Sequence, residues 1–255
     1  MASDSERGSG PRLIALLKLI AERGQAFSLK DLAERAALPS STVHRLLKTL
    51  VEAGMIERGE RQSYRPGREL FRMAALLRAQ FDLIETARPF LERLWSEWDE
   101  TSVLCIYNPS RRNASVVEVI HTTHPLRYAM EIGADLGLAW GSLGKAILAE
   151  LDEDVVEAVL ADPGIGPLSG RANPPLAELR DELDGIKRTG CALYDDSRYD
   201  ISGVAAAIFG RNRSVIGSIG LTMPSRRFAL RDRDGMISTV RLAATELSSL
   251  IALKI

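Results

Sequence analysis

A short stretch near residue 45 carries side chains that could contact a nucleic acid. The hydroxyls of Ser41 and Thr42 suit phosphate oxygens, and the guanidinium of Arg45 can give two donors to one guanine edge. Lys48 could contact a phosphate or a base. At about 100° per residue, Ser41, Arg45 and Lys48 share one side of a helix. His44 lies on its flank. The pattern predicts a helix whose polar side contacts double-stranded DNA.

The motifs that could support catalysis are each incomplete. The sequence GSLGK at residues 141–145 suggests a phosphate loop, but Ala139 stands where the loop needs a glycine. Ala146 also replaces the Ser or Thr that would coordinate magnesium. A nucleophile elbow is excluded because Gly141 directly precedes Ser142. We therefore expect that the protein is not an enzyme.

Residues that could bind a metal or act as a nucleophile also favour structural roles. His121 and His124 fall at a predicted strand-to-loop junction, with no nearby carboxylate or cysteine signature. Asp195 and Asp196 favour solvated or capping roles, and Cys105 lies in an apolar strand and favours the core. We expect no metal site and no cofactor.

A compact helical domain must position the residues near Arg45. Residues 12–23 have apolar residues at helical spacing. Ser28 is a suitable N-cap for a second helix over 29–37, and Ser40 for a third helix that ends at Gly54. The third helix has an apolar face formed by Val43, Leu46, Leu47, Leu50 and Val51.

Residues 55–64 predict a two-stranded hairpin with Gly59 and Glu60 near its tip. Three helices followed by a hairpin make a winged helix-turn-helix, whose third helix enters the major groove and whose wing follows the backbone or minor groove. The residues that we expect to contact DNA are Ser40, Ser41, Thr42, His44, Arg45, Lys48, Arg58 and Arg61. A helical domain that only dimerises is the alternative, but the apolar face, the turn and the basic face coincide here, which favours DNA binding.

The charge distribution agrees with a DNA-binding first part. Residues 1–80 hold 14 Lys and Arg against 9 Asp and Glu, whereas the remaining residues hold 19 against 25. Polyanion binding is thus expected of the N-terminal third alone.

The second part of the chain predicts an α+β domain. After a helix over 67–80 with an apolar stripe and a further helix over 82–100, the periodicity favours strands at 102–107, 115–120, 127–132, 203–209 and 214–222. Helices are expected at 142–150, 152–160, 176–189 and 231–253. We expect a winged helix-turn-helix domain over 9–69, a linker helix over 70–81 and a second domain over 82–255 built as an antiparallel sheet covered by helices.

Length and composition are those of a globular protein. The 255 residues are 45% hydrophobic and 26% charged, no apolar run approaches the roughly 18 residues of a membrane span, and residues 1–11 lack a signal-peptide core. Two cysteines cannot form a disulfide framework. A cytoplasmic location with no membrane association is expected.

Motifs in both parts resemble the IclR-type bacterial regulators. SLKDLA at 28–33, LPSSTVHRLL at 38–47 and YRPG at 64–67 resemble the DNA-binding region of that family. GKAILA at 144–149 is similar to its G-K-A-x-L-A helix. The resemblance spans the chain from about residue 11 to the last helix.

The resemblance implies a transcription regulator, a repressor or an activator, whose C-terminal domain is GAF-like and binds a small metabolite that modulates operator affinity. It also implies a homodimer or homotetramer on a pseudo-palindromic operator. Carried over by position, the effector-binding residues are Ser142, Leu143, Asp195, Gly203, Gly220 and Thr222.

Small residues at two of these positions lead us to expect a larger effector, such as an aromatic or other organic acid. Gly203 and Gly220 depart from the polar residues of the family's small-acid sensors, although both could equally serve strand packing. Arg127 could pair with a carboxylate and Trp140 could stack on a ring. A ligand-independent architectural DNA-binding protein, or an enzyme that uses the second domain, are the alternatives.

Overall fold

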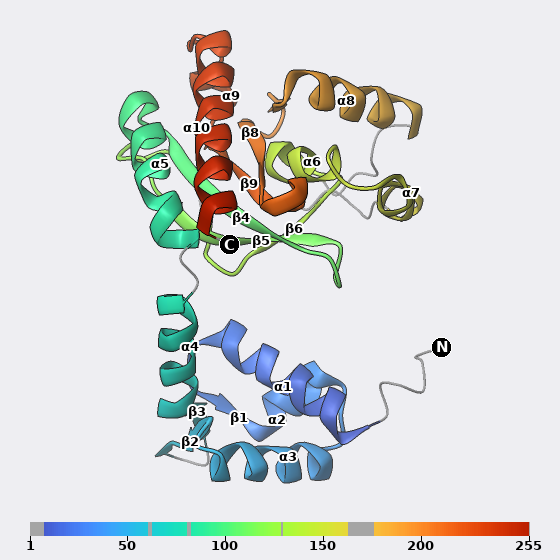
Figure 1. Ribbon diagram of the computed structural model, residues 1–255. Helices are drawn as coiled ribbons and strands as arrows, with labels where there is room; N and C mark the ends of the chain where they lie inside the picture. The colour runs from blue at the N-terminus through green and yellow to red at the C-terminus, as the bar shows by residue number, and fades with distance from the viewer. Residues whose placement is uncertain (1–7, 61–62, 81–82, 129, 163–175, 255) are drawn as a thin grey trace. The chain divides into compact units, whose positions relative to one another are not determined.

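The computed structural model describes residues 8–60, 63–80, 83–128, 130–162 and 176–254. The chain divides into two compact units between residues 82 and 83 (Figure 1). Leu83, which begins the second unit, lies one residue from the predicted start of the second domain.

Three helices form most of the first unit. They are α1 (Ser9–Arg23), α2 (Leu29–Ala36) and α3 (Ser40–Glu52), and their apolar faces meet in a core that includes Leu16, Ile20 and Leu47. The predicted cap of α2 is confirmed, because the Asp31 amide donates to Ser28 Oγ at 3.1 Å. The predicted cap of α3 is wrong. Pro39 is the N-cap and Ser40 is the first helical residue, so the Ser40 hydroxyl is exposed.

The wing hairpin follows α3 and forms a small antiparallel sheet with a short strand that precedes α2. Its strands are β1 (Phe27–Ser28), β2 (Ile56–Arg58) and β3 (Ser63–Pro66), in the order β1-β3-β2. The predicted hairpin is confirmed as β2 and β3. The third strand, β1, was not expected, and Phe27 stacks on Tyr64 across it at 6.0 Å. Helix α4 (Arg68–Gln80) follows the wing.

The second unit contains a six-stranded antiparallel sheet in the order β6-β5-β4-β9-β8-β7. The strands are β4 (Thr101–Asn108), β5 (Asn113–Ile120), β6 (Asp135–Gly137), β7 (Ala192–Asp196), β8 (Ile201–Phe209) and β9 (Val215–Met223). A 3₁₀ turn at Arg211–Arg213 joins β8 to β9.

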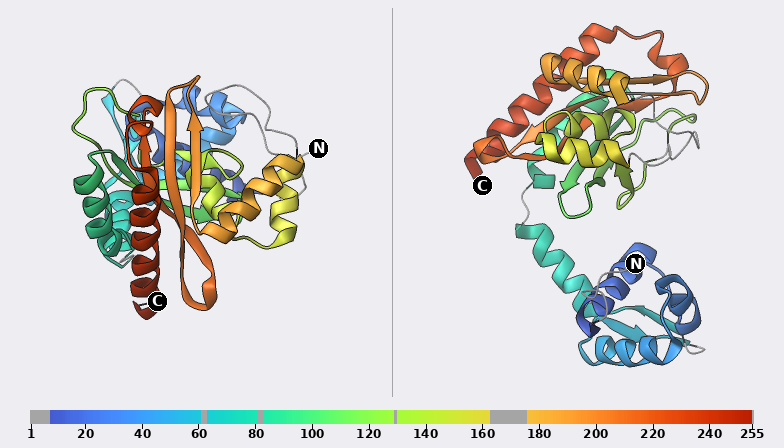
Figure 2. Two further views of the ribbon diagram at one scale, coloured as in Figure 1. Left: turned by 90° about the horizontal axis from the view of Figure 1, so that it is seen from above. Right: turned by 90° about the vertical axis from the view of Figure 1, so that its right-hand side faces the viewer.

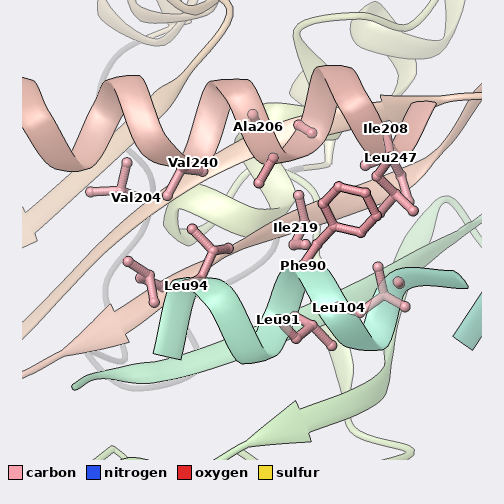
Figure 3. Close-up of a cluster of buried hydrophobic side chains, with 14 of the residues drawn as sticks. Phe90, Leu91, Leu94, Leu104, Val204, Ala206, Ile208, Ile219, Val240 and Leu247 are labelled. Atoms are coloured by element: carbon pink, nitrogen blue, oxygen red, sulfur yellow. The ribbon is translucent and has the colours of Figure 1, made fainter. Parts of the chain in front are cut away.

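Helices cover both faces of this sheet (Figure 2). On one face lie α5 (Leu83–Trp98) and α10 (Arg233–Lys254), whose apolar side chains pack on Val204, Ile219 and their neighbours (Figure 3). On the other lie α6 (Gly141–Leu148), α7 (Glu153–Ala161) and α8 (Leu176–Thr189). A short helix, α9 (Ser225–Phe228), precedes α10.

Successive residues of a strand point to opposite faces, which fixes what each helix layer contacts. In β8, Val204, Ala206 and Ile208 belong to the core under α5 and α10, whereas Ala205 belongs to the core under α6. The same alternation decides which side chains of β7, β8 and β9 can reach the surroundings of α6.

In the second unit, one predicted strand is wrong and two were missed. The described residues of 127–132 form no strand. Their inward-facing Tyr128 and Met130 line a cavity instead, and Ile132 is 66% exposed. The sheet is completed at one edge by β6 and at the other by β7, neither of which has enough alternation in the sequence to predict it.

Helix α10 is the one helix in the described part of the chain that is long and apolar enough to span a membrane. Met236, Val240, Ala243 and Leu247 are nevertheless buried against the sheet, which is the environment of a core helix. Cys105 is fully buried as predicted, and burial raises the pKa of its thiol to about 12.

Candidate nucleic-acid interface and effector pocket

Helix α3 separates an apolar face from a polar one. Val43, Leu46, Leu47 and Leu50 are buried in the first unit. The residues on the opposite side are exposed, namely Ser40, Ser41, His44, Arg45 and Lys48, and Thr42 is half-buried at the helix start. The predicted helical contact residues therefore lie together on one exposed surface, which we call the α3 polar face.

The α3 polar face is basic. Arg45 forms no ion pair with any residue that the structure describes, and Lys48 has only a long contact to Glu52, at 3.8 Å between Nζ and Oε1. A guanidinium without an internal partner keeps its donors available for another molecule. This arrangement suits an anionic partner such as nucleic acid.

The wing contributes one described basic residue of the two predicted. Arg58 is exposed at the end of β2, and Arg61 lies outside the described residues. Arg65 on β3 is occupied differently: it donates to Glu57 Oε2 at 2.9 Å, and this hydrogen bond lowers the pKa of Glu57.

The second unit holds a cavity of about 120 Å³ beside the first turn of α6. Rings and aliphatic side chains form most of its wall, from Tyr128, Met130, Leu136, Trp140, Leu143, Tyr194 and Ile201. An apolar cavity of roughly 150 Å³ is known to hold benzene, so the space suits a single ring.

Few polar groups reach the cavity. Its remaining wall consists of Gly137, Gly141, Gly203, Ser142, Ser202 and Thr222, so no charged side chain lines it among the described residues. Burial raises the pKa of Tyr128 and Tyr194, so both phenols stay protonated at neutral pH. The cavity therefore presents hydroxyls and backbone amides to a ligand.

Five of the eight predicted effector-binding residues line the cavity: Trp140, Ser142, Leu143, Gly203 and Thr222. Ser142, Gly203 and Thr222 come from α6, β8 and β9, yet the fold brings them together at one cavity. Tyr194 pairs with Gly203, and Gly203 pairs with Thr222, so these positions lie side by side on the α6 face.

Asp195 is not among the residues that line the cavity. Strand alternation turns its side chain to the other face of the sheet, where Oδ1 accepts from Ser202 Oγ at 2.5 Å. Ser202 also bonds to Ser225 at 2.9 Å, and Arg233 contacts Asp195 Oδ2 at 3.3 Å. Asp195 therefore fastens β7 to β8 and to the start of α10.

Gly220 and Arg127 also lie away from the cavity wall. Gly220 faces α6 deeper in the sheet, where an added Cβ would come within 2.3 Å of the Val204 carbonyl oxygen. Its small size therefore serves strand packing. Arg127 is exposed, on the segment that precedes Tyr128.

The cavity also contains residues that sequence reasoning missed. Tyr128 and Met130 were assigned to a strand, and Tyr194 belongs to the strand that was not predicted. Only the aromatic character of the two tyrosines could have marked them, since their positions depend on the fold.

Two ion pairs, each with one buried member, lie next to the cavity wall. Arg227 on α9 donates to Glu100 at 2.7 and 2.6 Å and to the carbonyl oxygen of Leu126 at 2.7 Å, two residues before Tyr128. Lys145 on α6 lies 2.6 Å from Glu182 on α8, and its Nζ is 5.8 Å from the Tyr194 ring centre. The first pair connects α9 to the segment that leads to Tyr128, and the second connects α8 to α6 beside the cavity.

His124 pairs with a neighbouring carboxylate. His124 Nε2 lies 3.2 Å from Asp99 Oδ2, and Asp99 also accepts hydrogen bonds from Thr122 and Thr123. Within the described ranges, no cluster of three or more His, Cys, Asp or Glu side chains has the arrangement of a metal site.

Comparisons with known proteins identify the family of both units. Residues 11–60 match the model of the IclR helix-turn-helix domain, and residues 75–249 match that of the bacterial transcriptional regulator IclR C-terminal domain. The transcriptional repressor IclR of Escherichia coli is 28% identical over 85% of this chain and 80% of its own length. An HTH-type transcriptional regulator of Mycobacterium tuberculosis is 31% identical over 89% of this chain and 88% of its own.

A solved structure shares the fold of nearly the whole chain. An IclR homologue from Microbacterium hydrocarbonoxydans, crystallised with 4-hydroxybenzoate, superimposes with a TM-score of 0.81 at 23% identity and covers 96% of this chain and 100% of its own.

Proposed function

Because the chain belongs to the IclR family of bacterial transcriptional regulators, we propose that its first unit binds an operator and its second unit binds a small organic acid that changes operator affinity. The first part is supported by the exposed basic side of α3. The opposite side of this helix packs into the core. The observation that carries the second is a ring-sized cavity without charged side chains among the described residues.

In the proposed complex, α3 lies in the major groove with its polar face on the base edges. Arg45 gives two donors to a guanine, Lys48 neutralises a phosphate, and the hydroxyls of Ser41 and Thr42 donate to phosphates near the helix start. Arg58 and Arg61 follow the DNA from the wing. A homodimer or homotetramer then reads a pseudo-palindromic operator, since one such helix covers one half-site.

We expect the variant Arg45→Ala to lose about 1–3 kcal/mol of operator binding free energy and to tolerate changes at one base pair of each half-site. The reason is the loss of a bidentate contact to a base. Fluorescence anisotropy with operator duplexes mutated at single positions measures both effects at fixed salt.

Lys48→Ala is the matched comparison on the same face. It should weaken binding to all duplexes evenly and reduce the salt dependence of log K by about one unit, because it removes a phosphate contact. Equal operator affinity and equal base preference in Arg45→Ala and the unmodified protein would remove Arg45 from the base contacts.

The effector that we propose is a compact aromatic or other organic acid. One ring fits the cavity between Tyr128, Trp140 and Tyr194, and its acid group lies at the first turn of α6, where N–H groups lack helical acceptors. The 4-hydroxybenzoate complex of the structural neighbour supports a ligand of this size. No cofactor and no metal enter this proposal.

Coupling between the two sites follows from linkage. An acid that binds one arrangement of the protein more tightly shifts operator affinity by that difference. The first test is an electrophoretic shift with the DNA upstream of the protein's own gene, at stated salt, with and without a panel of aromatic and aliphatic acids. A specific shift that one acid changes supports operator and effector together, whereas a shift that no acid changes supports DNA binding alone.

Ligand binding should also stabilise the protein against heat. At about 100 times its Kd, an effector adds about 2.7 kcal/mol and raises Tm by several degrees, because it binds the folded state. Differential scanning fluorimetry of the full chain with the acid panel measures this rise. If no acid changes Tm, a ligand-independent architectural DNA-binding protein becomes the better description. Turnover of any panel acid would instead favour an enzyme.

As a regulator of transcription the protein would act in the cytoplasm.

A further inference from the structure

Strand β8 continues beyond the end of its outer neighbour, β7. The pairing of the two strands ends at Ala192 and Ala205, whereas β8 runs on to Phe209. The chain enters β7 from α8 through Gly190, whose φ of 71° makes the turn into the sheet. In the described part of the chain, the outer edge of β8 therefore has no strand partner after Ala205.

The backbone groups at this free edge point away from the sheet. The Phe209 amide donates to Ser248 Oγ on α10 at 3.0 Å, whereas the next amide, that of Gly210, donates to the carbonyl oxygen of Ser214 on the β9 side. Because these directions alternate along a strand, the N–H and C=O of Ala207 point the same way as the Phe209 amide. Ala207 therefore offers a donor and an acceptor to a further strand.

A groove of about 520 Å³ lies along this edge. Ala206 and Ala207 point to opposite faces of the sheet, and both line the groove. One wall comes from α6 and α8, and the other comes from α10. Small residues surround the edge and leave room for a main chain, namely Ala146, Gly190, Ala206, Ala207, Gly210 and Ala244.

The groove is basic. Four of its described lining residues are cationic: Lys187 and Arg188 at the end of α8, Arg213 in the 3₁₀ turn after β8, and Arg241 on α10. The one acidic residue in that lining is Glu150, which lies 3.8 Å from Arg213. The other three cations form no ion pair with any residue that the structure describes. A second copy of this chain would bring like charges to the groove, whereas a partner with acidic side chains would compensate them.

We propose that this groove binds an extended acidic segment of another protein, which adds to the sheet as a strand beside β8. Backbone pairing at Ala207 holds the segment extended. Successive side chains of an added strand point to opposite faces, so acidic residues reach Arg188 on one wall and Arg241 on the other. The free edge, residues 206–210, pairs with about five residues of such a strand.

This docking site is separate from the effector cavity. None of the residues that line the groove also lines the cavity beside the first turn of α6. The inference therefore does not rest on operator or effector binding, and it assigns the second unit a protein partner in addition to a small molecule.

The test is fluorescence anisotropy of the full chain at low salt with a fluorescein-labelled peptide, Glu-Thr-Glu-Thr-Glu-Thr-Glu. A control peptide of the same sequence is N-methylated on its central amides, which keeps the charge but removes the donors for strand pairing. The unmodified protein should bind the first peptide at least about tenfold more tightly than the control.

Paired substitutions in the protein locate the bound peptide. Arg188→Gln/Arg241→Gln should weaken binding about tenfold and reduce its salt dependence, because two counter-charges are lost. Arg198→Gln/Arg226→Gln removes the same charge from two exposed arginines outside the groove and should change the affinity by less than about twofold.

Ala207→Pro tests the strand edge itself. Proline is tolerated in an edge strand where its missing N–H faces away from the neighbouring strand, so the variant should retain the circular dichroism of the unmodified protein. It should bind the peptide at least about tenfold more weakly, because the donor at the edge is absent. If the variant does not fold, the arginine pair and the N-methylated peptide still decide the question.

Three results would overturn the proposal: no binding of the first peptide, equal binding of the N-methylated peptide, or unchanged affinity in Arg188→Gln/Arg241→Gln. Because the α3 polar face is also basic, each measurement is repeated in an Arg45→Ala/Lys48→Ala background, and peptide binding that disappears there would also contradict a site in the groove. An oligodeoxythymidine of equal charge that binds as tightly, with the same dependence on Arg188 and Arg241, would show a general polyanion surface and overturn the peptide assignment.

Discussion

Replacing Arg227 by Met should lower the free energy of unfolding of the second unit by about 3–5 kcal/mol. Glu100 is fully buried, and Arg227 supplies its two short hydrogen bonds, at 2.7 and 2.6 Å. The remaining cation, Arg231, is 3.7 Å away and does not replace them. The variant would leave a carboxylate in the interior with little compensation, which is among the largest single-residue penalties known in proteins.

The same substitution should also loosen the cavity. Arg227 Nη1 holds the carbonyl oxygen of Leu126, and the chain that leads from there reaches Tyr128 in the cavity wall. Loss of that anchor should weaken the binding of 4-hydroxybenzoate even at temperatures where the variant remains folded. Calorimetric titration well below the midpoint of unfolding measures this second effect.

Arg226→Met is the matched control for Arg227→Met. Arg226 is the neighbouring residue of the same helix, but its side chain is 86% exposed and lies 3.8 Å from Asp200. Its substitution should change stability by less than about 0.5 kcal/mol. Urea unfolding of the full chain, followed by fluorescence and circular dichroism, gives both values. A loss below about 1 kcal/mol in Arg227→Met would contradict the importance of the pair.

Glu182→Gln should destabilise the protein by about 3 kcal/mol, whereas Lys145→Met should cost clearly less. Lys145 is only 6% exposed, and both oxygens of Glu182 accept from its ammonium group, at 2.8 and 2.6 Å. The glutamine variant leaves a buried charge. The methionine variant removes that charge and leaves Glu182, which is one-third exposed and can be hydrated.

The order of these two variants is the informative result. In urea unfolding, Lys145→Met should be more stable than Glu182→Gln. The double variant Lys145→Met/Glu182→Gln should also be more stable than Glu182→Gln, since it lacks the unpaired ammonium group. Equal losses in both single variants would show that Glu182 contributes packing rather than compensation of charge. Because Lys145 lies over the Tyr194 ring, the affinity for 4-hydroxybenzoate should be measured on the same samples.

Local patterns were sufficient for the helices and the hairpin of the first unit. The spacing of Val43, Leu46, Leu47 and Leu50 predicts both the buried face of α3 and, by subtraction, the exposed face that carries Arg45 and Lys48. Because a helix has a single period of 3.6 residues, the position of its apolar face fixes the direction of every other side chain on it. The predicted N-cap of α3 was wrong by one residue, because Pro39 is the N-cap and Ser40 is the first helical residue.

The second unit was predictable in its helices and long strands but not at its edges. Strands β8 and β9 have long apolar runs, whereas β6 and β7 are short and become strands only because a neighbour pairs with them. The stretch 127–132 has an apolar pattern that suits a strand, but Tyr128 and Met130 line the cavity instead. A pattern alone does not distinguish a sheet face from a cavity wall.

The sequence by itself determined the helices, the long strands and the basic face of α3, because these depend on periodicities within one element, whereas the region around α6 is expected to bind an effector only from the resemblance of GKAILA to the family. Only the tertiary structure decided which side chains meet in the cavity. That outcome depends on strand parity and register, which turn Tyr194 toward α6 and Asp195 away from it, and on a contact between Ser142 and Gly203 across 61 positions of the chain. A shift of one residue reverses the face of a strand, so no local pattern could have fixed these partners.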